Sequence, residues 1–181
     1  GITVPQKTGY AFAGYYTADN GTGTQYIDKD GKLTTGASAS NFGDSSGVLY
    51  ACWTANVYTV TLNDNDGAGG SGTIYEKYGV GWYSDSDCTS SITKVAIPTK
   101  SGYGFNGYYS GETKMISADG TISAANNAFS AAAALTASWS AGTYTATFDR
   151  NYTGAPTAEP ASETYDAAFV MPATATPTRT G

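Results

Sequence analysis

The chain has 181 residues, a net charge of −6 and no histidine. An acidic chain cannot neutralise a row of phosphates, so its composition excludes binding to nucleic acid and to anionic membrane surfaces. Because histidine is the commonest general base and metal ligand, its absence argues against an enzyme or a cofactor-binding protein.

The remaining composition favours β structure. Tyrosine (15) far outnumbers phenylalanine (6), glycine is frequent (23), and only 13% of residues are charged. Tyrosine and threonine suit half-buried strands, and glycine suits turns. No apolar run is long enough to cross a bilayer, so this segment is not expected to insert into a membrane. The chain also lacks an initiator methionine, which suggests a mature piece or a fragment.

The first predicted strand is an aromatic segment that occurs twice. T-G-Y-A-F-A-G-Y-Y at Thr8–Tyr16 returns as S-G-Y-G-F-N-G-Y-Y at Ser101–Tyr109. Alternation along a strand places Tyr103, Phe105 and Gly107 on one face and sends adjacent tyrosines to opposite faces. One tyrosine of each pair should therefore pack inward and the other lie at the rim. Both pairs are also candidates for stacking on sugar rings: Tyr15, Tyr16, Tyr108 and Tyr109.

A second segment is repeated in the same order. L-Y-A-C-W-T-A-N-V-Y-T-V-T-L at Leu49–Leu62 matches L-T-A-S-W-S-A-G-T-Y-T-A-T-F at Leu135–Phe148. P-T-K-S-G at Pro98–Gly102 matches P-T-R-T-G at Pro177–Gly181. These matches predict half a repeat unit at 1–56, one whole unit at 57–139 and half of the next unit at 140–181. The repeat-motif core is predicted to comprise Tyr10, Phe12, Trp53, Tyr103, Phe105 and Trp139.

Within the whole unit, strands are predicted at Val57–Leu62 and Thr73–Tyr78, and at the segment of Leu135, Ala137 and Trp139. Trp82 and Tyr83 lie in a loop or an edge addition, since the next unit lacks this segment. Ala124–Ala134 is a loop or one helical turn because no apolar stripe develops. Trp139→Ala should cost about 3–5 kcal/mol if the side chain is fully buried.

At these residues the chain resembles the Listeria–Bacteroides repeat, also called the internalin B-repeat family. The shared features are Y-T-V-T-L, P-T-K-S-G-Y-G-F-N-G-Y-Y and L-Y-A-C-W-T, with Tyr108 in place of the customary tryptophan. The resemblance implies tandem small β-grasp-like modules with little helix. It also implies exposure on the bacterial cell surface, a role as spacer or adhesive segment, and no catalytic residues.

The acidic loops and the two cysteines are the remaining candidate sites in the sequence. In the loops ending at Gly67 and Gly31, the first EF-hand ligand position falls on Leu62 and Tyr26, so no metal site is predicted. The acidic side chains Glu76, Glu112, Glu159 and Glu163 are interpreted as solvated surface. Two cysteines in an exported protein allow a disulfide, and they also allow two unpaired thiols: Cys52 and Cys88.

Three functions follow from these patterns. The favoured one is a stalk, spacer or filament, because the linkers T-A-N-V-Y and S-A-G-T-Y are short enough to hold neighbouring repeats in nearly fixed relation. The second is an adhesin repeat that binds glycans or host proteins through exposed tyrosines. The third is assembly into fibres through unpaired strand edges.

Overall fold

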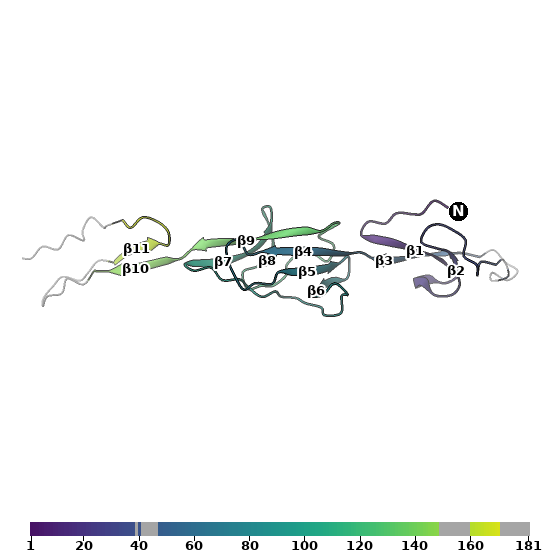
Figure 1. Ribbon diagram of the computed structural model, residues 1–181, viewed down its shortest axis with the longest axis horizontal. Coiled ribbons are helices and arrows are strands. Elements are labelled where there is room, and N and C mark those ends of the chain that lie inside the picture. The colour runs from purple at the N-terminus through teal and green to yellow at the C-terminus, as the bar shows by residue number, and fades with distance from the viewer. Residues whose placement is uncertain (39, 41–46, 149–159, 171–181) are drawn as a thin grey trace, which may run out of the picture.

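The computed structural model describes residues 1–38, 40, 47–148 and 160–170. It is a row of β modules along one long axis (Figure 1). Helix in the described residues is limited to short 3-10 structure such as η1 (Asp19–Gly21), so the prediction of a mainly β chain with little helix is confirmed. The strands are β1 (Tyr10–Tyr16), β2 (Gln25–Ile27), β3 (Tyr50–Ala55), β4 (Val57–Asn63), β5 (Thr73–Lys77), β6 (Gly81–Tyr83), β7 (Tyr103–Ser110), β8 (Thr113–Ser117), β9 (Ala133–Ala141), β10 (Thr143–Thr147) and β11 (Pro160–Thr164).

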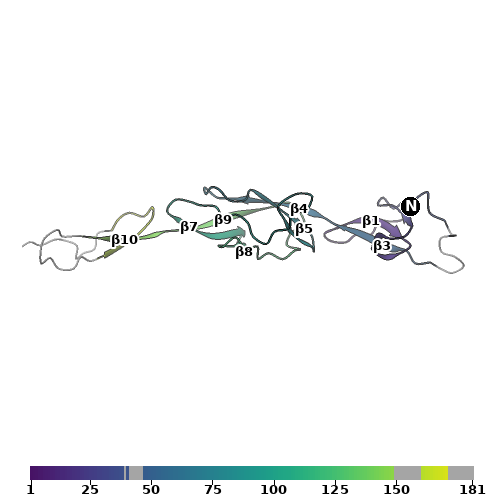
Figure 2. The ribbon, with the colours of Figure 1, turned by 90° about the horizontal axis from the view of Figure 1, so that it is seen from below.

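These strands form three separate sheets, one in each module. The N-terminal module has the order β2-β1-β3, the middle module has β6-β5-β4-β9-β7-β8, and the C-terminal module is the pair β10-β11. The two views at right angles show the modules strung end to end (Figures 1 and 2). The repeat boundaries after residues 56 and 139 stay a prediction, as does the β-grasp topology. The match at Pro177–Gly181 lies outside the described residues.

The middle sheet has a parallel pair at its centre. Strand β4 alternates between exposed threonines and inward aliphatic residues, and it pairs in parallel with β9 from Val60–Asn63 to Ala133–Thr136. Its other neighbour, β5, is antiparallel. The apolar faces of these strands supply much of the middle module's core: Val60, Leu62, Ile74, Trp82, Val95, Tyr108, Ile116, Leu135 and Ala137.

A bulge interrupts the aromatic strand of both repeats and alters the predicted alternation. In β7 the register shifts between Phe105 and Gly107, which pair with the consecutive residues Trp139 and Ser138. Phe105 and Gly107 therefore lie on opposite faces, and the prediction that they share one face is wrong. The extra residue instead brings Phe105 beside Tyr108, with ring centroids 5.2 Å apart. A β-bulge inserts one extra residue into one strand, and the residues after it are therefore shifted by one position relative to the partner strand.

Tyr108 is fully buried, so it cannot serve as the ligand-facing aromatic proposed from sequence. Its hydroxyl donates a hydrogen bond to Asp64, which follows β4. Burial raises the pKa of the phenol well above its ordinary value, and the hydrogen bond to Asp64 is the second largest cause of this shift. Its neighbour Tyr109 is half-buried at the rim, where the Lys114 Nζ lies 5.4 Å from its ring centroid. Tyr15 and Tyr16 are both half-buried.

Glu76 is buried, so the prediction that it lies on the solvated surface is wrong. The side chain on β5 has no exposed area and accepts backbone hydrogen bonds from Ala128 (2.7 Å) and Phe129 (3.0 Å). It thereby ties the long loop between β8 and β9 to the sheet. Burial raises the pKa of the carboxyl above its usual value, against the opposing effect of the two N–H donors.

Trp139 is half-buried, so its contribution to stability is smaller than the value for a fully buried ring. Its ring packs on Phe105 with centroids 5.4 Å apart, and its Nε1 donates to the Asp64 carbonyl oxygen at 3.1 Å. We expect Trp139→Ala to lower the free energy of unfolding of the middle module by about 2 kcal/mol. Denaturant titration with near-UV circular dichroism measures this loss. Trp139→Phe, which keeps the ring contact, should lose about 1 kcal/mol; equal losses would contradict the packing argument.

Candidate functional site: the joints between modules

A single residue separates the modules at each joint. Asn56 stands between β3 and β4, and Gly142 stands between β9 and β10. These two residues occupy matching positions in the repeated segments. Because one residue is too short to act as a flexible linker, each strand continues from one module almost directly into the next (Figure 1).

The backbone hydrogen bonds at the first joint recur at the second. Asn56 N–H donates to the Gly9 carbonyl at 2.9 Å, and the Asn56 carbonyl accepts from Tyr78 N–H at 2.9 Å. At the second joint, Gly142 N–H donates to Gly102 at 2.7 Å and its carbonyl accepts from Tyr165 N–H at 2.8 Å. The linking residue is thus held on one side by the preceding module and on the other by the following module.

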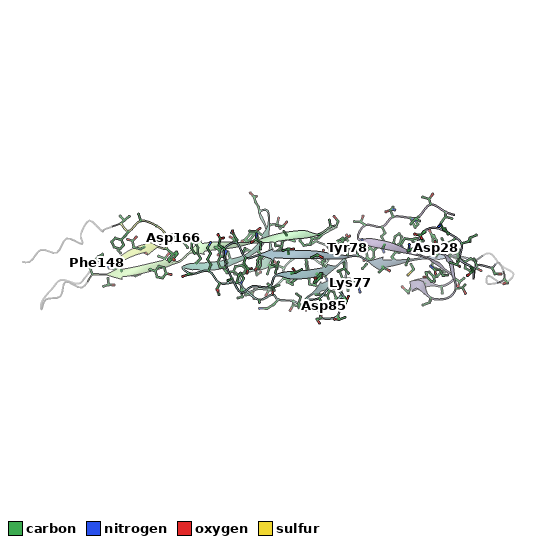
Figure 3. All side chains as sticks on the ribbon, in the orientation of Figure 1. Asp28, Lys77, Tyr78, Asp85, Phe148 and Asp166 are labelled. Atoms are coloured by element: carbon green, nitrogen blue, oxygen red, sulfur yellow. The ribbon has the colours of Figure 1, made fainter. Side chains whose placement is uncertain are left out.

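An aromatic contact repeats in the same way. Tyr10 and Tyr78 meet edge-on with centroids 5.6 Å apart, and Tyr103 and Tyr165 meet with centroids 5.5 Å apart. In each pair the first tyrosine belongs to the preceding module and the second to the following one. Figure 3 shows Tyr78 and Asp166, the neighbour of Tyr165, at the two module boundaries. Edge-to-face pairs of this kind contribute about 0.5–1.5 kcal/mol beyond the area that they bury.

A glycine beneath each ring makes the close approach possible. Gly9 has φ of +76°, and a Cβ at this position would lie 2.2 Å from the Tyr78 ring. Gly102 has φ of +77°, and its Cβ would lie 2.4 Å from the Tyr165 ring. The joint therefore explains why T-G-Y and S-G-Y both contain a glycine, since any side chain there would displace the ring and strain the backbone.

The two joints differ at the tyrosine hydroxyl. At the first, a Cβ on Gly79 would lie 2.6 Å from the Tyr10 hydroxyl, so glycine makes room for it. At the second, the equivalent position is Asp166, whose carboxylate accepts a hydrogen bond from the Tyr103 hydroxyl at 2.8 Å. That hydrogen bond is the main cause of the raised pKa of Tyr103.

A surface groove beside each joint also repeats. The first, of about 280 Å³, is lined by Lys7, Tyr10 and Trp53, and the second, of about 520 Å³, by Lys100, Tyr103 and Trp139. In both, the lysine lies over the tyrosine ring, at 4.2 Å and 4.8 Å from the centroid. Tyr109 lines the second groove. Each groove thus offers aromatic rings beside a cation.

Four of the six predicted motif aromatics pair within their own modules. Phe12 is buried and packs on Trp53 with centroids 5.5 Å apart, as Phe105 packs on Trp139. Tyr10, Trp53, Tyr103, Phe105 and Trp139 are half-buried. The sequence singled out these residues but assigned Tyr10 and Tyr103 to a core, whereas the structure places them at the joints. Tyr78, Tyr165, Gly9 and Gly102 were missed, although the repeated G-Y dipeptide was the signal that marked two of them.

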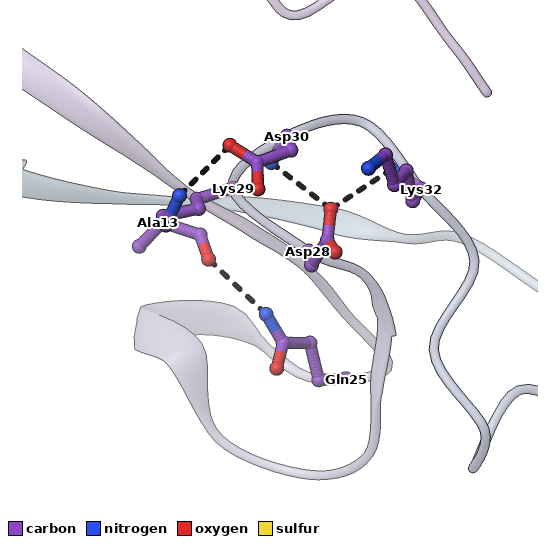
Figure 4. Close-up of polar contacts among 6 residues, drawn as sticks. All are labelled: Ala13, Gln25, Asp28, Lys29, Asp30 and Lys32. Atoms are coloured by element: carbon purple, nitrogen blue, oxygen red, sulfur yellow. Dashed lines mark hydrogen bonds and ion pairs between the residues drawn. The ribbon is translucent and has the colours of Figure 1, made fainter.

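The acidic loops and the cysteines do not converge. Asp28 accepts hydrogen bonds from the N–H groups of Asp30 and Lys32, both at 2.9 Å, and so shapes its own turn (Figure 4). No group of three or more aspartate, glutamate or cysteine side chains gathers as metal ligands within the described residues. Cys52 and Cys88 are both free thiols, so the disulfide that the sequence allowed is not formed.

No helix in the described part of the chain is long and apolar enough to cross a bilayer. Two relatives come from Evansella cellulosilytica, provisionally named a Gly-rich membrane protein (29% identity over 80% of this chain) and a membrane protein (30% over 82%). The chain spans only 14% and 18% of their lengths. No solved structure matches. The family model of the Listeria-Bacteroides repeat domain matches residues 2–39, which include β1 and β2, so the expected likeness to this family is confirmed over that segment.

Proposed function

We propose that this chain is a stalk or spacer segment of a bacterial surface protein, outside the cell, whose joints are locked against bending. The observation that carries the proposal is the repeated joint, in which the same two backbone hydrogen bonds and the same tyrosine pair occur twice. A passive linker would need neither a glycine under a ring nor an edge-on aromatic contact. The partners of each module are its neighbours in the chain, and the proposal includes no catalytic role.

Rigidity is tested by small-angle X-ray scattering of the whole chain. The scattering curve should be reproduced with one fixed arrangement of the N-terminal and middle modules, because the first joint holds these two larger modules together. A curve that requires a broad ensemble of angles between the modules would contradict a locked joint. Immunogold labelling of cells that make the parent protein tests its location: gold along surface projections supports the stalk, and label confined to the cytoplasm contradicts it.

A second function is favoured by the repeated grooves. An adhesin repeat could bind a glycan there, because sugar rings stack on aromatic faces and sugar hydroxyls bond to charged groups. Tyr109→Ala removes one wall of the second groove without touching a joint, and it should lower the affinity for a bound oligosaccharide at least about tenfold. Tyr50→Ala, at an exposed tyrosine outside both grooves, is the matched control. If the unsubstituted chain binds none of the sugars on an oligosaccharide array, this function is excluded.

Assembly into fibres is the remaining proposal about partners. The middle sheet ends on β6 and β8, the short strands at its two edges. Edge strands of this kind can pair with another copy of the chain. Sedimentation velocity over a range of concentrations separates a monomeric stalk from a polymerising one.

A further inference from the structure

The strand that enters the middle module and the strand that leaves it lie side by side. Strand β4 continues from the N-terminal module through Asn56, and β9 continues into the C-terminal module through Gly142. The two strands pair in parallel over four residue pairs, from Val60 with Ala133 to Asn63 with Thr136. Both run along the long axis of the molecule (Figures 1 and 2).

This arrangement fixes how tension would act on the module. A pull on the neighbours draws the first residue of β4 toward the N-terminal module and the last residue of β9 toward the C-terminal module. Because the strands are parallel, this pull slides one along the other and loads all their mutual hydrogen bonds at once. An antiparallel hairpin pulled at its open end would instead lose its bonds one after another.

Two side chains extend the connection beyond the paired residues. Asn65 donates through Nδ2 to the Ala137 carbonyl at 3.0 Å, and Trp139 donates through Nε1 to the Asp64 carbonyl at 3.1 Å. Each joins the turn after β4 to β9, beyond the last paired residues of the two strands.

The apolar side of the pair is closed to water. Val60, Leu62 and Leu135 are at most 5% exposed. Hydrogen bonds screened from water are stronger, and a broken one is not readily replaced by a bond to solvent. The parallel pair is therefore protected on the face that it presents to the core.

We propose that the β4–β9 pair, with Asn65 and Trp139, is a mechanical clamp that carries tension from one module to the next. The inference rests on the proposed function, since a stalk on a cell surface is pulled at its two ends. It adds that the middle module resists force by shear, a property that a rigid joint does not require.

Single-molecule force spectroscopy on the whole chain tests the clamp in two pulling directions. With handles at both termini, the middle module should unfold in one event that lengthens the chain by roughly 250 Å, the extended length of the module less the distance between its folded ends. With handles on cysteines introduced at Asp66 and Ser140, in a Cys52→Ser, Cys88→Ser background, the two strands are peeled from one end. We expect the unfolding force to be at least about twofold higher in the first direction, since forced unfolding follows the barrier and not the stability.

Two asparagine variants separate the clamp from general stability. Asn65→Asp removes a donor in the load path and keeps a residue that tolerates its φ of 49°. Asn106→Asp is the matched control: it also removes an amide that donates to β9, at Ser140 Oγ (2.7 Å), but from β7 outside the load path. Asn65→Asp should lower the terminal unfolding force, and Asn106→Asp should leave it unchanged.

Equal unfolding forces in the two directions would overturn the clamp. So would an equal effect of the two asparagine variants, or extension of the middle module with no distinct event. None of these results would alter the scattering curve, so the clamp and the rigid stalk fail separately.

Discussion

Gly9→Ala is expected to release the N-terminal module from the middle module while both stay folded. The new methyl group would lie 2.2 Å from the Tyr78 ring, so the ring must leave the joint or the two modules must separate. Scattering should then require an ensemble of angles between modules, and 15N relaxation should give the N-terminal module its own, shorter rotational correlation time. Tyr78→Ala, which removes the ring without backbone strain, should produce the same change in shape.

The control for Gly9→Ala is Gly111→Ala. Gly111 also has positive φ (+57°), but a Cβ there meets nothing within 4 Å. It should cost about 1–2 kcal/mol from the backbone alone and leave the shape unchanged. If Gly9→Ala leaves the scattering curve as it was, or if Gly111→Ala changes it equally, the joint is not locked by this contact.

Glu76→Ala is expected to produce the largest loss of stability in the middle module, about 3 kcal/mol or more. The substitution leaves the N–H groups of Ala128 and Phe129 without their acceptor and opens a cavity where a fully buried side chain stood. Denaturant titration measures the loss, and amide exchange should show the loop 123–132 opening first. Glu163→Ala is the comparison: this half-buried carboxylate accepts one backbone bond, from Val170 at 3.2 Å, and its loss should leave the middle module unchanged.

The buried carboxyl of Glu76 also predicts a pH dependence. Because its pKa is raised in the folded state, the folded protein binds a proton more readily than the unfolded chain. Its contribution to stability is fully present below the unfolded value of 4.5 and is lost as the pH rises through the folded pKa. The free energy of unfolding should therefore increase from pH 7 toward 4.5, and Glu76→Gln should flatten this slope. If the slope is unchanged in Glu76→Gln, a group other than Glu76 causes the pH dependence of stability.

Below that window the sign reverses. The pKa of Asp85 is lowered by the N–H groups of Thr89 and Ser90, and that of Asp119 by Lys94 and by Thr121. The stability that these aspartates provide is present above 3.8 and is lost as the pH falls through their folded values. We therefore expect the free energy of unfolding to be greatest between about pH 3.8 and 4.5.

The repeated motifs determined most of what could be known before the structure. Alternation along Val57–Leu62 was enough to place β4, because a strand has a period of two and only one face of this one meets the core. The brevity of T-A-N-V-Y and S-A-G-T-Y was enough to predict modules held close together, since a one-residue connection permits little motion. The G-Y dipeptide occurs once at each joint, but the sequence did not show that it contacts the next module.

Tertiary structure decided what depends on distant partners. Burial of Glu76 is set by a loop some fifty residues away that needs an acceptor, and nothing in the local sequence distinguishes it from a solvated glutamate. The inward turn of Tyr108 depends on a bulge, because one unpaired residue exchanges the two faces of a strand. The pairing of Tyr10 with Tyr78 and the parallel pairing of β4 with β9 join residues far apart in the chain. Periodicity reports which face of a strand is apolar, but only the fold determines what that face meets.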